Sequence, residues 1–156
     1  MVEFTVHGVA LDRKTGMPLV VLCSPEENLC VGIQVGPSEA SSIIVELEGV
    51  QPPRPLTHDL LGELFIRHGF RLEQVQIYDN IADRNLARIH YSKGFRKYSM
   101  ETRPSDAIAM AIRLTAPIYI EEGCIPSLVF LHDDGPDGDE SDFLYLENQQ
   151  INSQVV

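Results

Sequence analysis

Two short stretches set the places where helices of this chain are expected to begin: Pro52-Pro53-Arg54-Pro55-Leu56-Thr57-His58-Asp59 and Thr102-Arg103-Pro104-Ser105-Asp106-Ala107-Ile108. Each puts an arginine beside a proline, followed by a hydroxyl residue and an acid. Proline presets φ for the first helical turn, and Ser, Thr or Asp can accept hydrogen bonds from the unpaired N–H groups there. The pattern therefore predicts two capped helices, with Thr57 and Ser105 as capping residues.

The two stretches carry more polar groups than capping requires. Neither cap needs Arg54, Arg103 or the His58-Asp59 pair. A guanidinium binds phosphate through two parallel hydrogen bonds, and helix N-termini favour anions. Both stretches are therefore also candidates for a site that binds phosphate or another oxyanion. Because they share this composition, we expect the N-termini of the two helices to lie close together on one sheet.

Two further motifs accompany these stretches: Val35-Gly36-Pro37-Ser38-Glu39-Ala40 and Leu47-Glu48-Gly49-Val50. Together the motifs resemble the bifunctional nuclease family, over most of the chain from about Phe4 to about Ile125. The resemblance implies an α+β domain and a nuclease that acts on both DNA and RNA, which is a hydrolase of ester bonds. It places the polar helix starts inside the family's motifs but brings no agreed set of catalytic residues.

Hydrophobic periodicity divides the chain into strands and helices. Alternation or short apolar runs predict strands, and apolar residues at helical spacing predict helices. Strands are predicted over residues 2–12, 19–23, 29–35, 70–79, 86–91, 95–101 and 117–120, and helices over 37–48, 57–68 and 104–114. A turn is predicted over 80–85, and 124–131 fits either a short helix or a strand. This order predicts an α+β fold, a single domain with a mixed or antiparallel twisted sheet and about three helices packed on it.

Charge is unevenly distributed along the 156 residues, whose net charge is −11. All 12 Lys and Arg and 14 of the 23 Asp and Glu lie at or before Arg113, so that part carries −2. The charge pattern divides the chain into a bifunctional-nuclease-like domain, 1–131, and an acidic, flexible C-terminal tail, 132–156. Within the tail, Phe143-Leu144-Tyr145-Leu146 is predicted to form a small docking helix or to pack on a neighbouring subunit.

Composition bears on the class of protein and its compartment. A hydrophobic share of 44% is ordinary for a globular protein. No apolar run approaches the roughly 20 residues that a membrane helix needs, so no membrane association is expected. With no visible secretory signal and no Cys-x-x-Cys pair, Cys23, Cys30 and Cys124 are expected to be reduced core thiols of a cytoplasmic protein. The acidic net charge counts against nucleic-acid binding, although the acid is concentrated in the tail.

The residues that could carry chemistry stand at or near the helix starts. Phosphodiester hydrolysis needs groups that hold the phosphate, activate water and stabilise developing charge. The catalytic candidates are His58, Asp59, Asp106 and Glu39, and the candidates for binding the substrate phosphate are Arg54, Arg103, Thr57 and Ser105. Asp59 and Asp106 are also candidate ligands for a divalent metal such as Mg²⁺. The alternative is structural, because first-turn carboxylates gain from the helix dipole and arginines can pair with acids of a neighbouring helix.

A second candidate surface is the stretch from Arg84 to Arg103, which holds six Lys or Arg and one acid, with aromatic residues between them. Basic strands with aromatics can bind nucleic acid through phosphate contacts and base stacking. The alternative is a solvated hairpin whose basic side chains protect a sheet edge. Alternation over 86–91 sends Arg88 and His90 to one face and apolar residues to the other, which favours the alternative.

The function predicted from these residues and the resemblance is hydrolysis of phosphodiester bonds in DNA, RNA or both, with nucleic acid as the partner. Two alternatives stay open: a non-enzymatic oligomeric module for binding or regulation, and a protein that binds a small anionic ligand such as a nucleotide. A homo-oligomer, most simply a twofold dimer, is expected. The early strands and Phe143–Leu146 offer more apolar surface than a monomer usually exposes.

Overall fold

The computed structural model describes residues 1–131 and 143–145. Within them the chain forms three α-helices, a short 3₁₀ helix and nine strands. The helices are α1 (Pro37–Leu47), α2 (Thr57–Arg67), α3 (Pro104–Leu114) and the 3₁₀ helix η1 (Ile125–Ser127). The strands are β1 (Val2–Asp12), β2 (Pro18–Ser24), β3 (Leu29–Gln34), β4 (Arg71–Ile81), β5 (Arg84–Lys93), β6 (Arg96–Thr102), β7 (Ile118–Ile120), β8 (Val129–Leu131) and β9 (Phe143–Tyr145).

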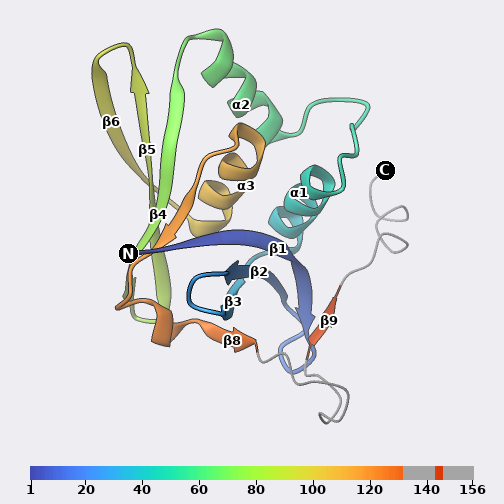
Figure 1. The fold of residues 1–156 in the computed structure, drawn as a ribbon. Helices are drawn as coiled ribbons and strands as arrows, with labels where there is room; N and C mark the ends of the chain where they lie inside the picture. The colour runs from blue at the N-terminus through green and yellow to red at the C-terminus, as the bar shows by residue number, and fades with distance from the viewer. Residues whose placement is uncertain (132–142, 146–156) are drawn as a thin grey trace.

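The described strands form one mixed sheet in the order β6-β5-β4-β7-β1-β2-β3-β8, with β9 paired to β1. The pair β4–β7 is parallel, and the other pairs are antiparallel. β1 serves both halves of the sheet, because Val2–Phe4 pair with β7 and Thr5–Leu11 pair with β2. A bulge between Val6 and Gly8 lies in the second part, and bulges bend a strand. Figure 1 shows β1 passing from the half that contains β4 to the half that contains β2 and β3.

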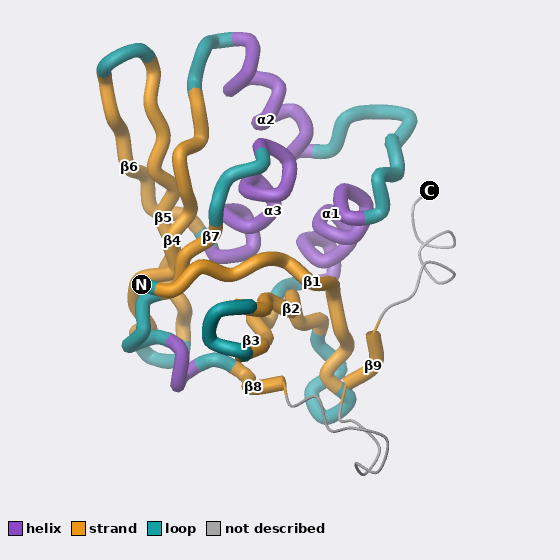
Figure 2. Tube along the Cα trace, viewed as in Figure 1, coloured by secondary structure: helices purple, strands orange, loops and turns teal. Residues whose placement is uncertain are grey.

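The three helices lie together on one side, in the angle between β4–β6 and β1–β3 (Figure 2). α1 and α3 each begin with a proline at the first turn, where a missing N–H costs nothing. Both bury an apolar face, which includes Ile43 in α1 and Ile108 in α3, each 0% exposed. α2 differs, because Gly62 is its one buried residue and faces Leu114 of α3. α1 and α3 therefore form the core layer, and α2 lies over α3.

These elements confirm the predicted single-domain α+β fold and the three predicted helices. The predicted turn over 80–85 is too wide, since β4 runs to Ile81 and β5 starts at Arg84. Ala82 and Asp83 have φ of 51° and 61°, as both central residues of a type I′ hairpin turn require. Residues 124–131, for which the sequence predicts either a short helix or a strand, contain one of each, η1 and β8.

The prediction of three reduced cysteines is wrong. Cys23 and Cys30 form a disulfide, and Cys124 is buried in the core. The reason is the register of the β2–β3 hairpin, which places Cys23 directly opposite Cys30 with their Cα atoms 4.1 Å apart. Spacing in the sequence does not reveal this register. The cytoplasmic location, which rested partly on reduced thiols, stays a prediction.

The C-terminal tail is described only in part. Phe143–Tyr145 form β9, whose Tyr145 pairs with Ala10 of β1. The predicted docking helix is therefore wrong for these three residues, because they complete the chain's own sheet. Residues 132–142 and Leu146 lie outside the described residues, and the division of the chain at 131 stays a prediction.

Candidate functional site

The candidate site is centred on His58, which joins all three helices. Its Nδ1 lies 2.8 Å from the Ser42 Oγ of α1, and its Nε2 lies 2.9 Å from the Asp106 Oδ1 of α3. The His58 side chain is 13% exposed, so the ring is largely shielded from water. The predicted approach of the N-termini of α2 and α3 is confirmed by this contact.

Arg103 ties the start of α3 to α1. Its Nε and one terminal nitrogen donate to the two carboxylate oxygens of Asp106, at 2.8 and 3.0 Å. The other terminal nitrogen donates to Glu39 Oε1 at 2.9 Å. These bonds use three of the five guanidinium N–H groups, and the described residues show no partner for the other two. The Arg103 side chain is 65% exposed, so those two groups can meet a ligand from solvent.

Asp59 belongs to a second, more buried pair. Its Oδ1 accepts a 2.7 Å hydrogen bond from Arg113 Nε, and its Oδ2 accepts one from the Leu56 N–H at 2.8 Å. The Arg113 side chain is 5% exposed and also donates to the Ser42 carbonyl oxygen and to Ser42 Oγ, at 3.1 and 3.0 Å. Arg113 therefore joins the Asp59 pair to the His58 cluster through Ser42.

The surroundings shift the pKa of both carboxylates in the same direction. Burial alone raises the pKa of Asp106, but hydrogen bonds from Arg103 and His58 outweigh it and leave the pKa below its usual range. Burial likewise raises the pKa of Asp59, and the hydrogen bonds from Arg113 and Leu56 lower it overall. Both groups are therefore carboxylates at neutral pH, ready to accept hydrogen bonds and to stabilise a cation beside them.

A surface pocket of about 520 Å³ opens beside His58. Its lining includes Glu39, Ser42, Thr57, His58, Arg103 and Asp106. A neighbouring pocket of about 840 Å³ shares Glu39 and Arg103 and includes Ser105. The arrangement thus offers an exposed guanidinium, a shielded imidazole and two carboxylates along one hollow, where a phosphate could meet both a cation and a base.

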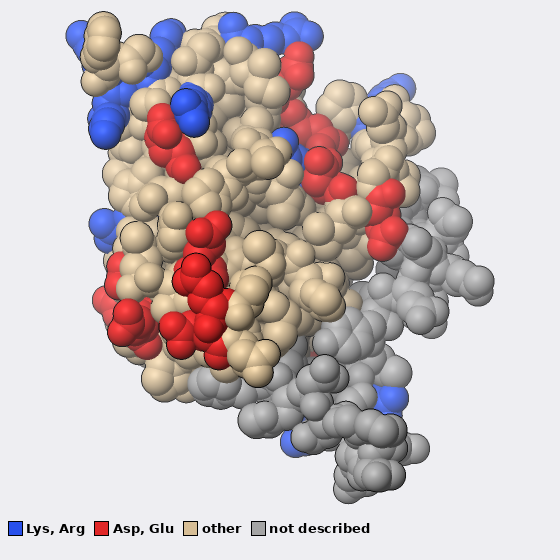
Figure 3. Space-filling model, viewed as in Figure 1, with Lys and Arg blue, Asp and Glu red and all other residues tan. Residues whose placement is uncertain are grey.

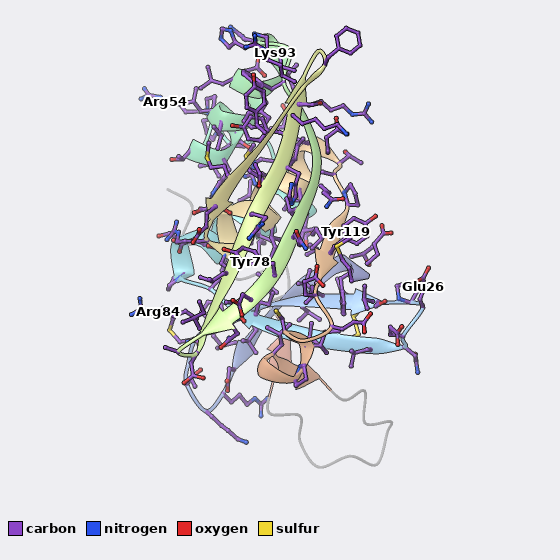
Figure 4. The ribbon with its side chains drawn as sticks, turned by 90° about the vertical axis from the view of Figure 1, so that its left-hand side faces the viewer. Glu26, Arg54, Tyr78, Arg84, Lys93 and Tyr119 are labelled. Carbon is purple, nitrogen blue, oxygen red and sulfur yellow. A yellow bond between two sulfur atoms is a disulfide. The ribbon has the colours of Figure 1, made fainter. Side chains whose placement is uncertain are left out.

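The structure brings most of the predicted site residues together. Glu39, Thr57, His58, Arg103 and Asp106 line the first pocket, and Ser105 lines the second. Asp59 lies behind the pocket lining, against Arg113. Arg54 is exposed in the loop before α2 and points away from the body of the molecule (Figure 4), with no ion pair to another described residue. Arg54 is therefore not part of the His58 cluster, and its contact with phosphate stays a prediction.

The predicted capping roles of Thr57 and Ser105 are wrong. The N-cap residues are Leu56 and Arg103, and neither α2 nor α3 has a side-chain hydrogen bond from its cap. In α2 the Asp59 carboxylate reaches back to the Leu56 N–H instead, which is one half of a capping box. Thr57 is the first residue of α2 and lines the first pocket, and Ser105 is the second residue of α3 and lines the second.

Sequence reasoning missed Ser42 and Arg113. A signal existed for each, because Ser42 follows Glu39 by three residues and Arg113 follows Asp106 by seven, which are same-face spacings on a helix. Arg113 is also the basic residue in the last turn of α3, directly after a run of apolar residues. What spacing does not supply is the partner, since the Arg113–Ser42 contact joins residues 71 positions apart.

The predicted Mg²⁺ site does not fit the arrangement of these side chains. Among the described residues no group of three or more His, Cys, Asp or Glu is placed to hold a metal ion. Asp59 and Asp106 each accept hydrogen bonds from a guanidinium, so each carboxylate already has a cation beside it. The metal requirement stays a prediction. In the part of the chain that the structure describes, no helix is long and apolar enough to cross a membrane.

Comparison with known proteins gives a family match and several relatives. The sequence model of a family described as bifunctional nuclease domain matches residues 20–128. An uncharacterised protein of Mycobacterium tuberculosis is 34% identical over 137 residues, covering 88% of this chain and 82% of that protein. Bifunctional nuclease 1 of rice, Oryza sativa subsp. indica, is 25% identical over 121 residues, covering 73% of this chain but 32% of the rice protein.

Proposed function

The chain belongs to the bifunctional nuclease domain family, and on that premise we propose that it hydrolyses phosphodiester bonds of DNA, RNA or both at the His58 pocket. The observation that carries the proposal is the His58 ring, held between Ser42 and Asp106 beside the exposed Arg103 guanidinium. A base and a phosphate-binding cation along one pocket are the minimum set for attack of water on a phosphodiester.

Arg103 is the proposed phosphate-binding group. Its guanidinium is oriented by Asp106 and Glu39 from two helices, so little side-chain freedom is left to lose when a phosphate binds. The two N–H groups without a partner among the described residues supply the donors for the phosphate oxygens. Asp106 and Glu39 thus act on Arg103 as positioning residues, and Arg103 contacts the substrate.

His58 is the proposed general base, and its neighbours select its tautomer. Because the Asp106 carboxylate can only accept, Nε2 of the neutral ring carries the hydrogen and donates it to Asp106. Nδ1 is then an acceptor, so the Ser42 hydroxyl donates to it while Ser42 Oγ accepts from Arg113. A proton taken up at Nδ1 passes through the Ser42 hydroxyl, and the Asp106 carboxylate stabilises the imidazolium that forms.

The proposal is tested with purified protein and labelled single- and double-stranded DNA and RNA, each with Mg²⁺ and with EDTA. His58→Gln should lower the cleavage rate by about a hundredfold or more, the usual contribution of a general base. His68→Gln is the matched control, because His68 stands exposed at the other end of α2. Thermal melts of both variants establish that they are folded.

Two results would contradict the proposal, the first by removing the nuclease activity and the second by removing His58 as its general base. One is a wild-type protein that cleaves none of the four substrates with or without Mg²⁺. The other is a folded His58→Gln protein that cleaves as fast as the wild type. Cleavage that persists in EDTA would remove the predicted metal requirement and leave the proposed roles of His58 and Arg103 in place.

The non-enzymatic alternative is favoured by a specific observation, the buried Asp59–Arg113 pair. Arg113 is 5% exposed and binds groups of all three helices: Asp59 of α2, Ser42 of α1 and Ala109 of its own α3. Such a pair fixes the relative position of the helices whether or not chemistry follows. If the first negative result is obtained, a binding or regulatory module with the same pocket becomes the better assignment.

A further inference from the structure

The free end of the β5–β6 hairpin carries a basic cluster around a fully exposed aromatic ring. Lys93 and Arg96 close the hairpin, and Gly94 and Phe95 form its two-residue turn. Gly94 has φ of 58°, as the first turn position of a type II′ hairpin requires. Phe95 is fully exposed, and Lys93, Arg96 and Lys97 beside it are exposed as well. We name these four residues the hairpin tip.

Polar residues in the body of the β5–β6 hairpin contact other side chains of the sheet, whereas two of the basic residues in the tip form no ion pair with a described residue. The Arg88 guanidinium lies 3.6 Å from the centre of the Tyr78 ring, and His90 hydrogen-bonds Gln76. In the tip, Lys93 lies over the Phe70 ring at 5.0 Å, whereas Arg96 and Lys97 make no ion pair with any described residue. The solvated-hairpin interpretation therefore explains the body of the hairpin but leaves the tip without a role.

This arrangement costs stability in the isolated protein. Lys93 lies directly opposite Arg96 across the ladder, and like charges in that position repel. Phe95 lies between them with its ring exposed to water, so the ring contributes no free energy from apolar burial. A partner that carries negative charge and a flat apolar face would reduce the charge repulsion and would also cover the exposed ring.

The tip stands on a rigid base of aromatic rings. Phe65, Phe70, Tyr91 and Tyr98 form a cluster in which Tyr91 stacks on Tyr98 with ring centres 5.2 Å apart. The cluster joins α2 to the hairpin, so the tip and the C-terminal end of α2 form one end of the molecule. Figure 3 shows Lys and Arg side chains gathered along this end, at the top of the view, and acidic side chains below it.

We infer that the hairpin tip binds a single strand of nucleic acid, with a base stacked on Phe95 and phosphates at Arg96, Lys97 and Lys93. Aromatic rings bind unpaired bases because every base has a flat π face, and Lys and Arg neutralise the phosphates. The inference rests on the proposed nuclease function and deepens it. α2 begins at the His58 pocket and ends beside the tip, and its 11 residues span about 16 Å. A substrate strand a few nucleotides long can therefore contact the pocket and the tip together.

The binding test uses a fluorescently labelled single-stranded 20-nucleotide DNA and RNA, with the His58→Gln background so that cleavage does not interfere. Phe95→Ala should weaken binding about fivefold or more, and Phe95→Trp should restore it, since the stacking face is kept. Arg96→Gln/Lys97→Gln should weaken binding and reduce the slope of log affinity against log salt by roughly 0.7 for each lost phosphate contact. Arg13→Gln/Lys14→Gln is the control for charge, because both residues are exposed in the turn between β1 and β2 and line neither pocket.

The activity test separates this inference from the nuclease assignment. With His58 intact, the Phe95→Ala and Arg96→Gln/Lys97→Gln variants should lose kcat/KM on the 20-nucleotide strand and keep it on bis(p-nitrophenyl) phosphate, which is too short to reach the tip. A wild type that binds strands through the tip but cleaves neither substrate would end the nuclease assignment and leave the tip as a binding surface.

Three outcomes would overturn the inference. In the first, the tip variants bind single strands as tightly as the His58→Gln parent. In the second, the Arg13→Gln/Lys14→Gln control loses as much affinity as the Arg96→Gln/Lys97→Gln variant, so that only overall charge matters. In the third, Phe95→Ala abolishes binding to vesicles of anionic phospholipid while binding to single strands is unchanged, which would make the tip a membrane contact.

Discussion

At the scale of single residues, Asp59 and Asp106 occupy the same helical position in different surroundings. Each is the third residue of its helix, and each pairs with an arginine. The partner of Asp59, Arg113, is 5% exposed, whereas the partner of Asp106, Arg103, is 65% exposed. Removal of one carboxylate therefore strands a buried cation, and removal of the other leaves a cation that water and Glu39 can still stabilise.

We expect the two Asp→Asn variants to separate stability from catalysis. Asp59→Asn should cost about 3 kcal/mol of unfolding free energy and leave cleavage by the folded protein unchanged. Asp106→Asn should cost roughly 0.3–1 kcal/mol, the scale of a lost helix-dipole interaction, and lower cleavage by about a hundredfold or more. Urea melts and nuclease assays on the same preparations measure both quantities. An Asp106→Asn protein that melts far lower yet cleaves normally while folded would make Asp106 architectural.

At the scale of elements, the register of the β2–β3 hairpin decided the state of two cysteines that composition alone had predicted to be reduced. β2 is almost wholly buried, so its pairing with β3 is set by which side chains must face the core. That register brings Cys23 opposite Cys30 and closes a loop with a sequence separation of seven. The disulfide therefore constrains a short loop at the far end of the hairpin from the His58 pocket, and we expect it to contribute to stability and not to catalysis.

Reduction of this disulfide should lower stability by about 2–3 kcal/mol, the loop-closure term for a ring of this size. Thermal melts with and without reductant measure the effect in the wild type. The Cys23→Ser/Cys30→Ser variant should melt at the temperature of the reduced wild type and show no response to reductant. Equal melting of the wild type under both conditions, or intact-mass data that show two free thiols here, would contradict the disulfide.

At the scale of the whole molecule, the apolar surface is not where periodicity suggested. Leu19, Val20, Val21 and Leu22 of the early strands are at most 1% exposed, so they cannot form the oligomer interface that we predicted from them. Exposed apolar side chains lie instead on α2, where Leu60 is 57% and Leu64 is 44% exposed. The reason is the layer order, since α2 packs on α3 and presents its other sides to solvent. The dimer stays a prediction, now with α2 as its interface.

Light scattering at micromolar concentration should return about two chain masses for the wild type. Leu60→Glu/Leu64→Glu places two charges on one face of α2 and should shift the protein to one chain mass. Val50→Glu is the control, because Val50 is 52% exposed in the loop outside α2 and should leave the mass unchanged. A wild type of one chain mass would remove the prediction of a homo-oligomer.

Local rules were sufficient for the elements of this protein. Pro37 and Pro104 begin α1 and α3, the apolar spacing of each helix follows the 3.6-residue repeat, and Gly49 with φ of 65° follows the end of α1. These features depend on neighbours along the chain, so the sequence by itself determined the three helices, most strands and the α+β class. It also determined the chemistry available at the helix starts, which included His58, Asp106 and Arg103.

Only the tertiary structure decided which of these groups meet. Ser42 contacts His58 across 16 positions, His58 contacts Asp106 across 48, and Arg113 contacts Ser42 across 71. The same packing excluded Arg54 from the cluster, buried the early strands and exposed Phe95 at the hairpin tip. Periodicity describes which face of an element is apolar, but it contains no term for the angle and offset at which two elements pack. Those two quantities placed Ser42, His58 and Arg113 against their partners, whereas the Arg103–Asp106 pair is local to the start of α3.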